Sequence, residues 1–355
     1  MSKVCFVTGG AGFIGCAISK SLADRYSTVI AIDNMHPQIH SSADRPALLD
    51  SRVELIVGDV TDKTLWDDIL KNQTPDIVYH LAAETGTGQS LMEASRHAEV
   101  NIVGTTRMLD AFSSHGIIPE RIVLTSSRAV YGEGGWNDAA GNTVYPGQRT
   151  NEMLQASQWD FLGLAAQPFE ASKTQTHPTS IYGVTKLSQE QLINSWANSY
   201  GVKTSILRLQ NVYGVGQSLT NPYTGIVSFF SQLSKAGQSI PLYEDGEVVR
   251  DFVYISDVAQ ALILAGDTEE SGFVFDVGSG RSITIRELAT IIAARYAAPA
   301  PHVCGKYRNG DVRHASCQIS STKEGLGWTP EVSVESGIDK LCTWIDSSEE
   351  GIKFS

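Results

Sequence analysis

The sequence has little of what marks membrane, secreted or nucleic-acid-binding proteins. No apolar run approaches the roughly 18 residues that a membrane-spanning helix needs, and no signal-peptide pattern comes before the first strand-like segment. Basic residues are outnumbered, with 27 Lys and Arg against 39 Asp and Glu and a formal net charge of -12. A chain this acidic is a poor general binder of nucleic acids or anionic membranes. We therefore expect a cytoplasmic protein with neither kind of partner.

Cysteine is also scarce, because the five residues are scattered and form no C-x-x-C pair. This pattern argues against a disulfide framework and against a zinc site, and we expect no bound metal. Charged residues make up only 19% of the 355 residues and hydrophobic residues 42%. This composition excludes global disorder and allows one large or two medium domains with a well-filled core.

Strand-like and helix-like segments alternate from the amino terminus. Apolar runs at residues 3–8, 28–33, 76–83 and 121–127 alternate with helical spacing, as at 13–25. This order predicts βαβ units, a parallel sheet and, with right-handed crossovers, a doubly wound (Rossmann) α/β fold.

The chain divides into two expected domains. Residues 1–212 form the Rossmann domain, interrupted at 136–178 by a polar, Gly- and Pro-containing segment that we interpret as an inserted loop or lid. Residues 213–355 form mainly a smaller α/β region for the substrate, and 251–268 return to the Rossmann domain.

A glycine-rich turn follows the first strand-like run. The stretch VTGGAGFIG places Gly9, Gly12 and Gly15 where a strand ends and a helix begins. Glycines there let the backbone approach a pyrophosphate, which the N–H groups of the helix N-terminus bind. Asp33 ends the second strand, suits the adenosine ribose and would repel a 2′-phosphate. The turn therefore predicts NAD rather than NADP, the alternative being a purely structural turn.

Two further strand ends lie near the expected cofactor. Asp59 could bond the adenine amine, with Val60 against the ring, or could instead be the N-cap of the next helix. The stretch HLAA, from His80 to Ala83, ends the fourth strand with small residues where a cofactor would pass. We interpret His80 as a packed core residue rather than as a catalyst.

The stretch SIYGVTK separates Tyr182 and Lys186 by four positions, so both project from one face of a helix. A lysine cation beside a phenol lowers the pKa of the phenol, which can then take a proton from a sugar hydroxyl near neutral pH. The lysine can also hold the nicotinamide ribose. A surface Tyr–Lys pair is the alternative, which the glycine turn upstream makes less favourable.

Together these motifs resemble the extended short-chain dehydrogenase/reductase superfamily, and within it the NAD-dependent nucleotide-sugar epimerases and dehydratases. The likeness covers nearly the whole chain. It implies that Ser127 is the catalytic hydroxyl, rather than a strand-end cap, and that Asn101 ties the active-site backbone together. The residues expected at the cofactor are Gly9, Gly12, Phe13, Ile14, Gly15, Asp33, Asn34, Asp59, Val60, Leu81, Ala82, Ala83, Asn101, Tyr182 and Lys186.

The stretch TSSRAVYG argues against one branch of this family. Nucleotide-sugar dehydratases carry Thr-Asp-Glu there, because the loss of water needs a further acid and base. Here the matching residues are Ser127, Arg128 and Ala129, and neither Arg nor Ala can serve as that acid or base. The resemblance therefore implies a reaction with one acid–base group, the reversible oxidation at C4 of the sugar.

The substrate side is predicted from resemblance alone. Arg250 and Arg308 are expected to grip the diphosphate, Asp311 the nucleoside ribose, and Asn211 the diphosphate or the sugar. The loops around ETGTGQS and NVYGVGQSLTNPYTGI look most like those of dTDP-L-rhamnose 4-epimerases. The expected substrate contacts are Thr85, Thr87, Ser127, Arg128, Asn211, Asn221, Arg250, Arg308 and Asp311, with residues 221–224 on the thymine side.

We therefore expect an isomerase, an NAD-dependent sugar-nucleotide 4-epimerase that interconverts dTDP-L-rhamnose and dTDP-6-deoxy-L-talose. A UDP-hexose 4-epimerase, a 4-keto-6-deoxy-sugar reductase and a catalytically silent NAD-binding regulator are the alternatives. A homodimer through a four-helix interface of residues 98–112 and 181–200 is expected by the same resemblance.

Overall fold

The computed structural model describes residues 3–40, 42–219, 221 and 225–348. Its centre is a seven-stranded sheet in the order β13-β9-β5-β4-β1-β2-β3, in which every neighbouring pair is parallel. Its strands are β1 (Val4–Thr8), β2 (Thr28–Asp33), β3 (Glu54–Val57), β4 (Ile77–His80), β5 (Arg121–Ser127), β9 (Lys203–Leu209) and β13 (Phe273–Val277). The expected doubly wound α/β fold is confirmed.

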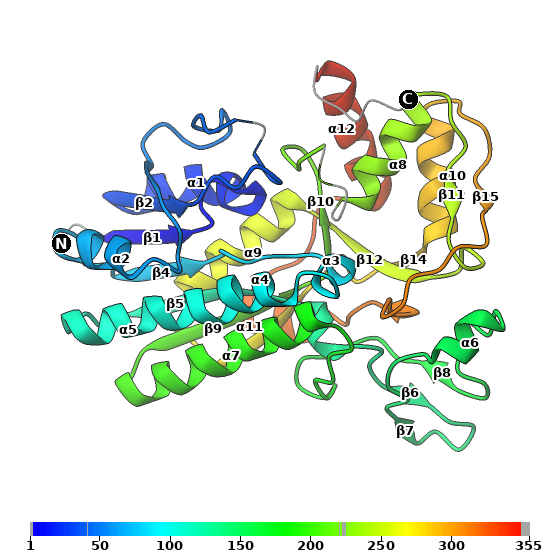
Figure 1. Ribbon diagram of the computed structural model, residues 1–355, viewed down its shortest axis with the longest axis horizontal. Coiled ribbons are helices and arrows are strands. Elements are labelled where there is room, and N and C mark those ends of the chain that lie inside the picture. Colours follow the sequence, from blue (N-terminus) through cyan, green and yellow to red (C-terminus); the bar gives the residue numbers. More distant parts are fainter. Residues whose placement is uncertain (1–2, 41, 220, 222–224, 349–355) are drawn as a thin grey trace.

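Helices cover both faces of this sheet (Figure 1). One face carries α1 (Phe13–Arg25), α9 (Ile255–Asp267) and α11 (Ser320–Leu326), and the other carries α2 (Lys63–Leu70), α5 (Thr105–His115) and α7 (Ile181–Tyr200). Alternate strand residues serve the two layers: Cys5 and Val7 pack on the α1 side and Phe6 on the α5 side. Burial on both faces explains why these strands are continuous apolar runs in the sequence.

The chain turns in opposite directions from the adjacent strands β1 and β4. From β1 it passes to β2 and β3 on one side, and from β4 to β5, β9 and β13 on the other. In open α/β sheets the crevice at the carboxyl ends of two such strands is the usual ligand site. The short helices α3 (Thr87–Ser90) and α4 (Ala94–Ala98), with a π-helix at Glu99–Gly104, lie between β4 and α5 in the sequence, next to this crevice.

The inserted segment is more ordered than a loop. It contains the three-stranded antiparallel sheet β7-β6-β8 and the helix α6 (Asn151–Gln155). The strands are only two residues each: β6 (Trp136–Asn137), β7 (Thr143–Val144) and β8 (Ala165–Ala166). Such short strands give too little periodicity for the sequence to predict.

The smaller region has its own core, formed by α8 (Ile226–Lys235), α10 (Ile285–Arg295) and α12 (Val334–Ser347). The strands beside these helices are β10 (Asn211–Tyr213), β12 (Val249–Tyr254), β14 (Ser282–Thr284) and β16 (His314–Ala315), with β11 (Pro241–Leu242) paired to β15 (His302–Val303). The chain returns to the main sheet over a longer stretch than 251–268, because β13 is an edge strand of that sheet and α11 packs against β13.

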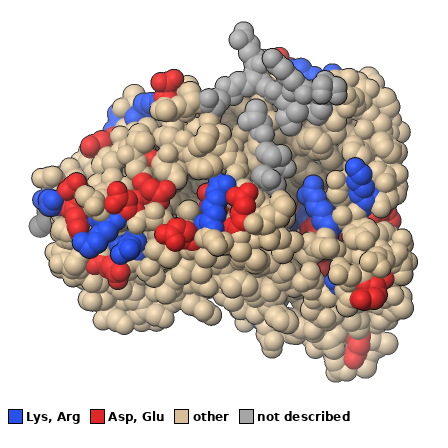
Figure 2. All heavy atoms as spheres, viewed as in Figure 1, with Lys and Arg blue, Asp and Glu red and all other residues tan. Residues whose placement is uncertain are grey.

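Charged side chains of both signs are interspersed over the face shown in Figure 2. Many form exposed pairs, such as Lys3 with Glu120 at 2.7 Å, which contribute little to stability. Within the described ranges, no helix is both long and apolar enough to cross a membrane.

Candidate active site

The glycine turn packs directly against the end of β4. Gly9 has a φ of +66°, and a Cβ there would lie 2.8 Å from the backbone nitrogen of Ala82. A Cβ on Gly15 would lie 2.5 Å from the carbonyl oxygen of Gly10. Gly10, which the sequence analysis did not single out, has the same constraint, because its Cβ would lie 2.6 Å from the Ala31 side chain. These close approaches require glycine on steric grounds.

Asp33 joins the end of β2 to this turn. The carboxylate accepts hydrogen bonds from the backbone N–H of Ala11 at 3.1 Å and of Met35 at 3.0 Å. His40 Nε2 lies 3.5 Å from the same carboxylate. Asp33 is therefore held rigidly beside the turn, where the sequence analysis placed it.

Asp59 has local partners. It accepts hydrogen bonds from Asn34 Nδ2 at 2.8 Å and from the backbone and hydroxyl of Thr61. Burial raises the pKa of Asp59, but these hydrogen bonds outweigh it and hold the pKa below its ordinary value. The N-cap of α2 is Asp62, so the alternative role considered for Asp59 is wrong. Val60 is buried beside Gly104.

Asn101 lies in the π-helix and connects two parts of the site. Its Oδ1 accepts the N–H of Glu84 at 2.7 Å, and its Nδ2 donates to the Glu84 carbonyl at 3.0 Å and to Thr185 Oγ1 at 2.9 Å. Asn101 thus fastens the loop after β4 to the helix that carries Tyr182. π-helical turns occur frequently at functional sites.

Ser127 and Tyr182 come together at the end of β5. Ser127 caps the short 3-10 helix Arg128–Tyr131 by accepting the Ala129 N–H, and its hydroxyl lies close enough to the Tyr182 phenol to lower the pKa of that phenol. Gly183 makes this approach possible, because a Cβ there would lie 2.4 Å from the Ala129 carbonyl oxygen. The pKa of the Tyr182 phenol lies above its ordinary value, because burial outweighs the Ser127 hydrogen bond and the Arg128 charge that lower it; the lowered pKa expected from the sequence is therefore wrong for the chain by itself.

From its sequence spacing Lys186 is expected to tune the phenol, but its ammonium contacts a residue of its own helix. The cation that lowers the Tyr182 pKa is Arg128, while the Lys186 ammonium donates to Gln189 Oε1. Burial lowers the pKa of Lys186 to about 7, and Glu190 partly offsets this. The four-residue spacing places Lys186 and Tyr182 on the same face of the helix but does not determine which side chain the Lys186 ammonium contacts.

A buried polar chain continues behind Lys186. Gln189 Nε2 donates to Thr105 Oγ1 at 2.9 Å and lies 3.2 Å from His80 Nε2, whose other ring nitrogen is 2.7 Å from Thr8 Oγ1. Burial and the Lys186 charge lower the pKa of His80 to about 3, so the ring is neutral at pH 7. His80 is thus a buried link between β1 and the helix of Tyr182.

Several of the expected substrate groups lie around Arg128. Arg250 donates to Asp311 Oδ1 at 2.7 Å, and Arg128 Nε donates to Asn211 Oδ1 at 2.9 Å. Burial and repulsion from Arg250 lower the pKa of Arg128 to about 9, so it remains protonated at neutral pH. Burial raises the pKa of Asp311, but nearby arginines, first Arg250, outweigh it and hold the pKa below its ordinary value. The exposed Arg308 lies 5.1 Å from the Tyr243 ring centre.

A small cavity lies beside Arg128 and Asp311. Its lining includes Thr87, Arg128, Ser180 and Asp311. Thr85 is not among the lining residues; its carbonyl oxygen lies 3.4 Å from His97 Nε2. Asn221 is buried, and residues 222–224 lie outside the part of the chain that the structure describes.

Residues 5–278 match the family model described as "NAD dependent epimerase/dehydratase family". The chain belongs to this family. It is 57% identical to a dTDP-L-rhamnose 4-epimerase of Burkholderia thailandensis over 97% of this chain and 95% of that protein. It resembles the structure of a Thermotoga maritima UDP-glucose 4-epimerase with UDP-glucose, at 29% identity and a TM-score of 0.80, over 98% of this chain and all of the other. A Thermus thermophilus UDP-glucose 4-epimerase complex with NAD shows 28% identity and a TM-score of 0.77, over 97% of this chain and 99% of that one.

Family membership confirms the expected relationship and the expected cofactor, NAD. In this protein the N-terminus of α1 can accommodate the pyrophosphate of NAD. Gly12 is the N-cap of α1 and has no side chain to cover the first N–H groups of that helix, so they can face a pyrophosphate. When bound, NAD supplies the hydride acceptor and donor; the chain's own residues bind it, orient it and move the proton.

Proposed function

We propose that this protein is an NAD-dependent nucleotide-diphosphate-sugar 4-epimerase that interconverts dTDP-L-rhamnose and dTDP-6-deoxy-L-talose. The observation that carries the proposal is the paired Ser127 and Tyr182 hydroxyls, followed by Arg128 and Ala129 where a dehydration would need an acid and a base. The high identity to a dTDP-L-rhamnose 4-epimerase along nearly the whole chain supports the sugar and the base.

In the proposed reaction, Tyr182 accepts the proton of the C4 hydroxyl while Ser127 hydrogen-bonds the same oxygen. The C4 hydrogen leaves with its electron pair, and a 4-keto sugar forms. The keto sugar turns over at the active site and is reduced from its opposite face. Tyr182 then returns the proton to the C4 oxygen, so the enzyme and its oxidised cofactor are regenerated without an external oxidant.

The residues around the reacting pair orient the substrate. Arg128 provides a permanent cation close to Tyr182, and its charge favours the phenolate during proton removal. Arg250, Arg308 and Asp311 hold the nucleoside diphosphate, and a diphosphate would gain charge-assisted hydrogen bonds there. Lys186 holds the nicotinamide ribose, and Gly9, Gly12, Gly15 and Asp33 hold the adenosine half of NAD.

Proton NMR of the purified protein with dTDP-L-rhamnose, without added cofactor, tests the proposal. Loss of the large H4 diaxial splitting, together with a talose-type spectrum that grows to a fixed ratio, is the expected result. An unchanged spectrum from protein shown to carry NAD would reject this substrate. Turnover of UDP-hexoses would then show a UDP-hexose epimerase, and loss of NADH with 4-keto sugars a reductase. NAD without any turnover would favour a regulator.

We also propose a homodimer formed through α5 and α7, and a cytoplasmic location. Both helices lie on the same side of the central sheet and pack against each other, which leaves their outer faces available to a second copy. Light scattering after size-exclusion chromatography measures the mass and tests the dimer.

A further inference from the structure

The inserted segment is attached to the substrate region at two separate places. At its carboxyl end, the Phe169 N–H donates to the Ser316 carbonyl and the Phe169 carbonyl accepts from Gln318, both at 2.8 Å. The Phe169 ring stacks on Tyr131 at 4.6 Å. These are ordinary backbone and apolar contacts, and they explain how this end is held.

The other attachment is ionic and centres on Arg149, which is 3% exposed. Its guanidinium forms a two-pronged pair with Glu244, at 2.8 and 2.9 Å. The same guanidinium donates to the backbone carbonyl of Asp311 at 2.8 Å. Arg149 therefore joins the insert to the residue whose side chain pairs with Arg250.

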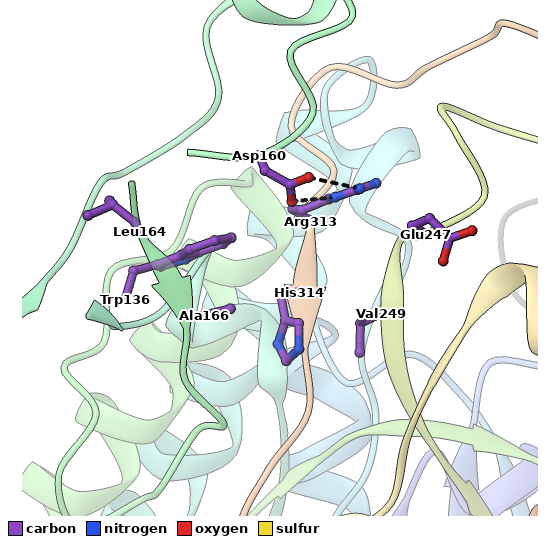
Figure 3. A pocket seen from close by; sticks show the side chains of 8 residues that line it. All are labelled: Trp136, Asp160, Leu164, Ala166, Glu247, Val249, Arg313 and His314. Atoms are coloured by element: carbon purple, nitrogen blue, oxygen red, sulfur yellow. Dashed lines mark hydrogen bonds and ion pairs between the residues drawn. The ribbon is translucent and has the colours of Figure 1, made fainter. Parts of the chain in front are cut away.

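A second buried arginine extends this network. Arg313 donates twice to Asp160 in the insert and twice to Asp245 beside Glu244, at 2.7 to 3.1 Å. The backbone N–H of Arg313 reaches both carboxylate oxygens of Glu133. Figure 3 shows the Asp160–Arg313 pair above the seam between the insert and the substrate region.

The seam beneath this pair is incompletely packed. A cavity of about 230 Å³ lies there, between Trp136, Leu164 and Ala166 of the insert and Glu247, Val249 and His314 opposite (Figure 3). Close packing normally fixes the relative position of two elements, and a cavity of this size removes such contacts. The ionic network therefore has a larger share in holding this part of the seam.

The backbone at Glu244 has a strained conformation, which indicates that the position of its carboxylate is constrained. Glu244 has a φ of +53°, in the left-handed region that non-glycine residues rarely occupy. Such strain persists only where the surrounding structure over-determines it, and it clusters at functional positions. Here it coincides with the carboxylate that grips Arg149.

We propose that Arg149 is a positioning residue, through which the inserted segment holds the 308–311 turn so that Arg308, Asp311 and Arg250 face the nucleoside diphosphate. The inference rests on the proposed function for the identity of that ligand. It gives the insert a role in substrate affinity rather than in the chemical step. Arg149 itself touches the Asp311 carbonyl and Glu244, so its effect passes through the turn.

Arg149→Lys keeps the charge but cannot form the two-pronged pair and the Asp311 contact together. We expect KM for the sugar nucleotide and Kd for dTDP each to rise by about tenfold, which is a typical effect of a coupled pair. We expect kcat to stay within about twofold, because the reacting groups are unchanged, and NAD content to stay the same. Arg281→Lys, on an exposed pair with Glu335, is the matched control and should change none of these quantities.

A double-mutant cycle with Asp311→Asn separates positioning from a general loss of structure. If Arg149 acts through the turn, the double variant should raise Kd little beyond the larger single effect. Independent, additive effects would overturn the proposal, as would a wild-type Kd for dTDP in Arg149→Lys. If Arg149→Lys does not fold, Glu244→Gln weakens the same pair from the other side and must show the same rise. Because dTDP binding is measured without the sugar, failure of rhamnose turnover would refute the proposed substrate and leave this test intact.

Discussion

Tyr182→Phe removes one hydroxyl and should separate chemistry from folding. The ring itself has other supports: it lies edge-on to His97 at 6.5 Å, and its backbone N–H donates to Ser90 Oγ at 3.1 Å. The hydroxyl lies near the Ser127 side chain, which lowers the pKa of the phenol and also caps the next turn by accepting the Ala129 N–H. The substitution therefore leaves the shape of the site nearly unchanged.

The two expected magnitudes differ widely. Loss of one hydrogen bond, net of solvent exchange, should lower the free energy of unfolding by about 1 kcal/mol or less. Loss of a positioned acid–base group typically lowers the rate about 10²- to 10⁴-fold. That loss corresponds to about 3–5 kcal/mol of transition-state stabilisation. The NAD content should match wild type.

The matched control is Tyr131→Phe. Tyr131 is also buried, and its hydroxyl donates to Asp276 at 2.8 Å. Because a buried carboxylate would lose its donor, this control should cost more stability than Tyr182→Phe, about 1–3 kcal/mol. Its kcat should stay within a few-fold of wild type, since it lies outside the reacting set.

The assay combines epimerisation rate by NMR, urea unfolding, and NAD released from denatured protein. Retention of more than about a tenth of kcat by Tyr182→Phe would contradict the assigned role. An equal fall of kcat in Tyr131→Phe would show that the rate follows stability rather than proton transfer.

Three further substitutions test other parts of the site. Burial raises the pKa of Glu133 to about 7, so the free energy of unfolding falls as pH rises from about 4.5 to 7. Glu133→Gln should reduce this fall by up to about 3 kcal/mol, measured by urea unfolding at pH 5 and pH 8. An unchanged dependence of stability on pH would contradict the burial argument. Asn101→Leu should lower the free energy of unfolding by about 1–3 kcal/mol, because both Glu84 backbone groups lose a hydrogen-bond partner. An unchanged midpoint of thermal unfolding would contradict the role of Asn101 in holding the loop after β4. Gly15→Ala forces the first turn of α1 away from Gly10 at a cost of about 1–3 kcal/mol, so NAD content should fall. In the control Gly141→Ala the new Cβ meets no neighbour but the φ of +85° is strained, so this variant should lose some stability and keep its NAD.

Local features of the site could be predicted because their geometry depends on neighbouring residues. The glycine turn, the end of β2 at Asp33 and the Tyr182–Lys186 spacing each follow from strand-to-helix order and helical periodicity. The helices α1 and α7 begin and end where the sequence analysis places them, at Phe13–Arg25 and Ile181–Tyr200. Membership of the family and NAD as cofactor followed from these same local motifs and are confirmed.

Partner choice among charged groups could not be predicted in this way. Lys186 contacts Gln189 on its own helix, whereas the cation that acts on Tyr182 is Arg128, from the end of another strand. Arg128 in turn contacts Asn211, 83 positions away. Which of several cations is nearest depends on how the strand ends converge.

The sequence by itself determined the layered α/β fold and the position of the glycine turn, because backbone sterics and side-chain periodicity act over short stretches. Only the tertiary structure decided which residues hold the inserted segment to the substrate region. Its short strands carry almost no periodic signal, and Arg149 meets Glu244 across 95 positions of the chain. Buried ion pairs such as this one join residues that are far apart in the sequence, so local sequence patterns cannot predict them.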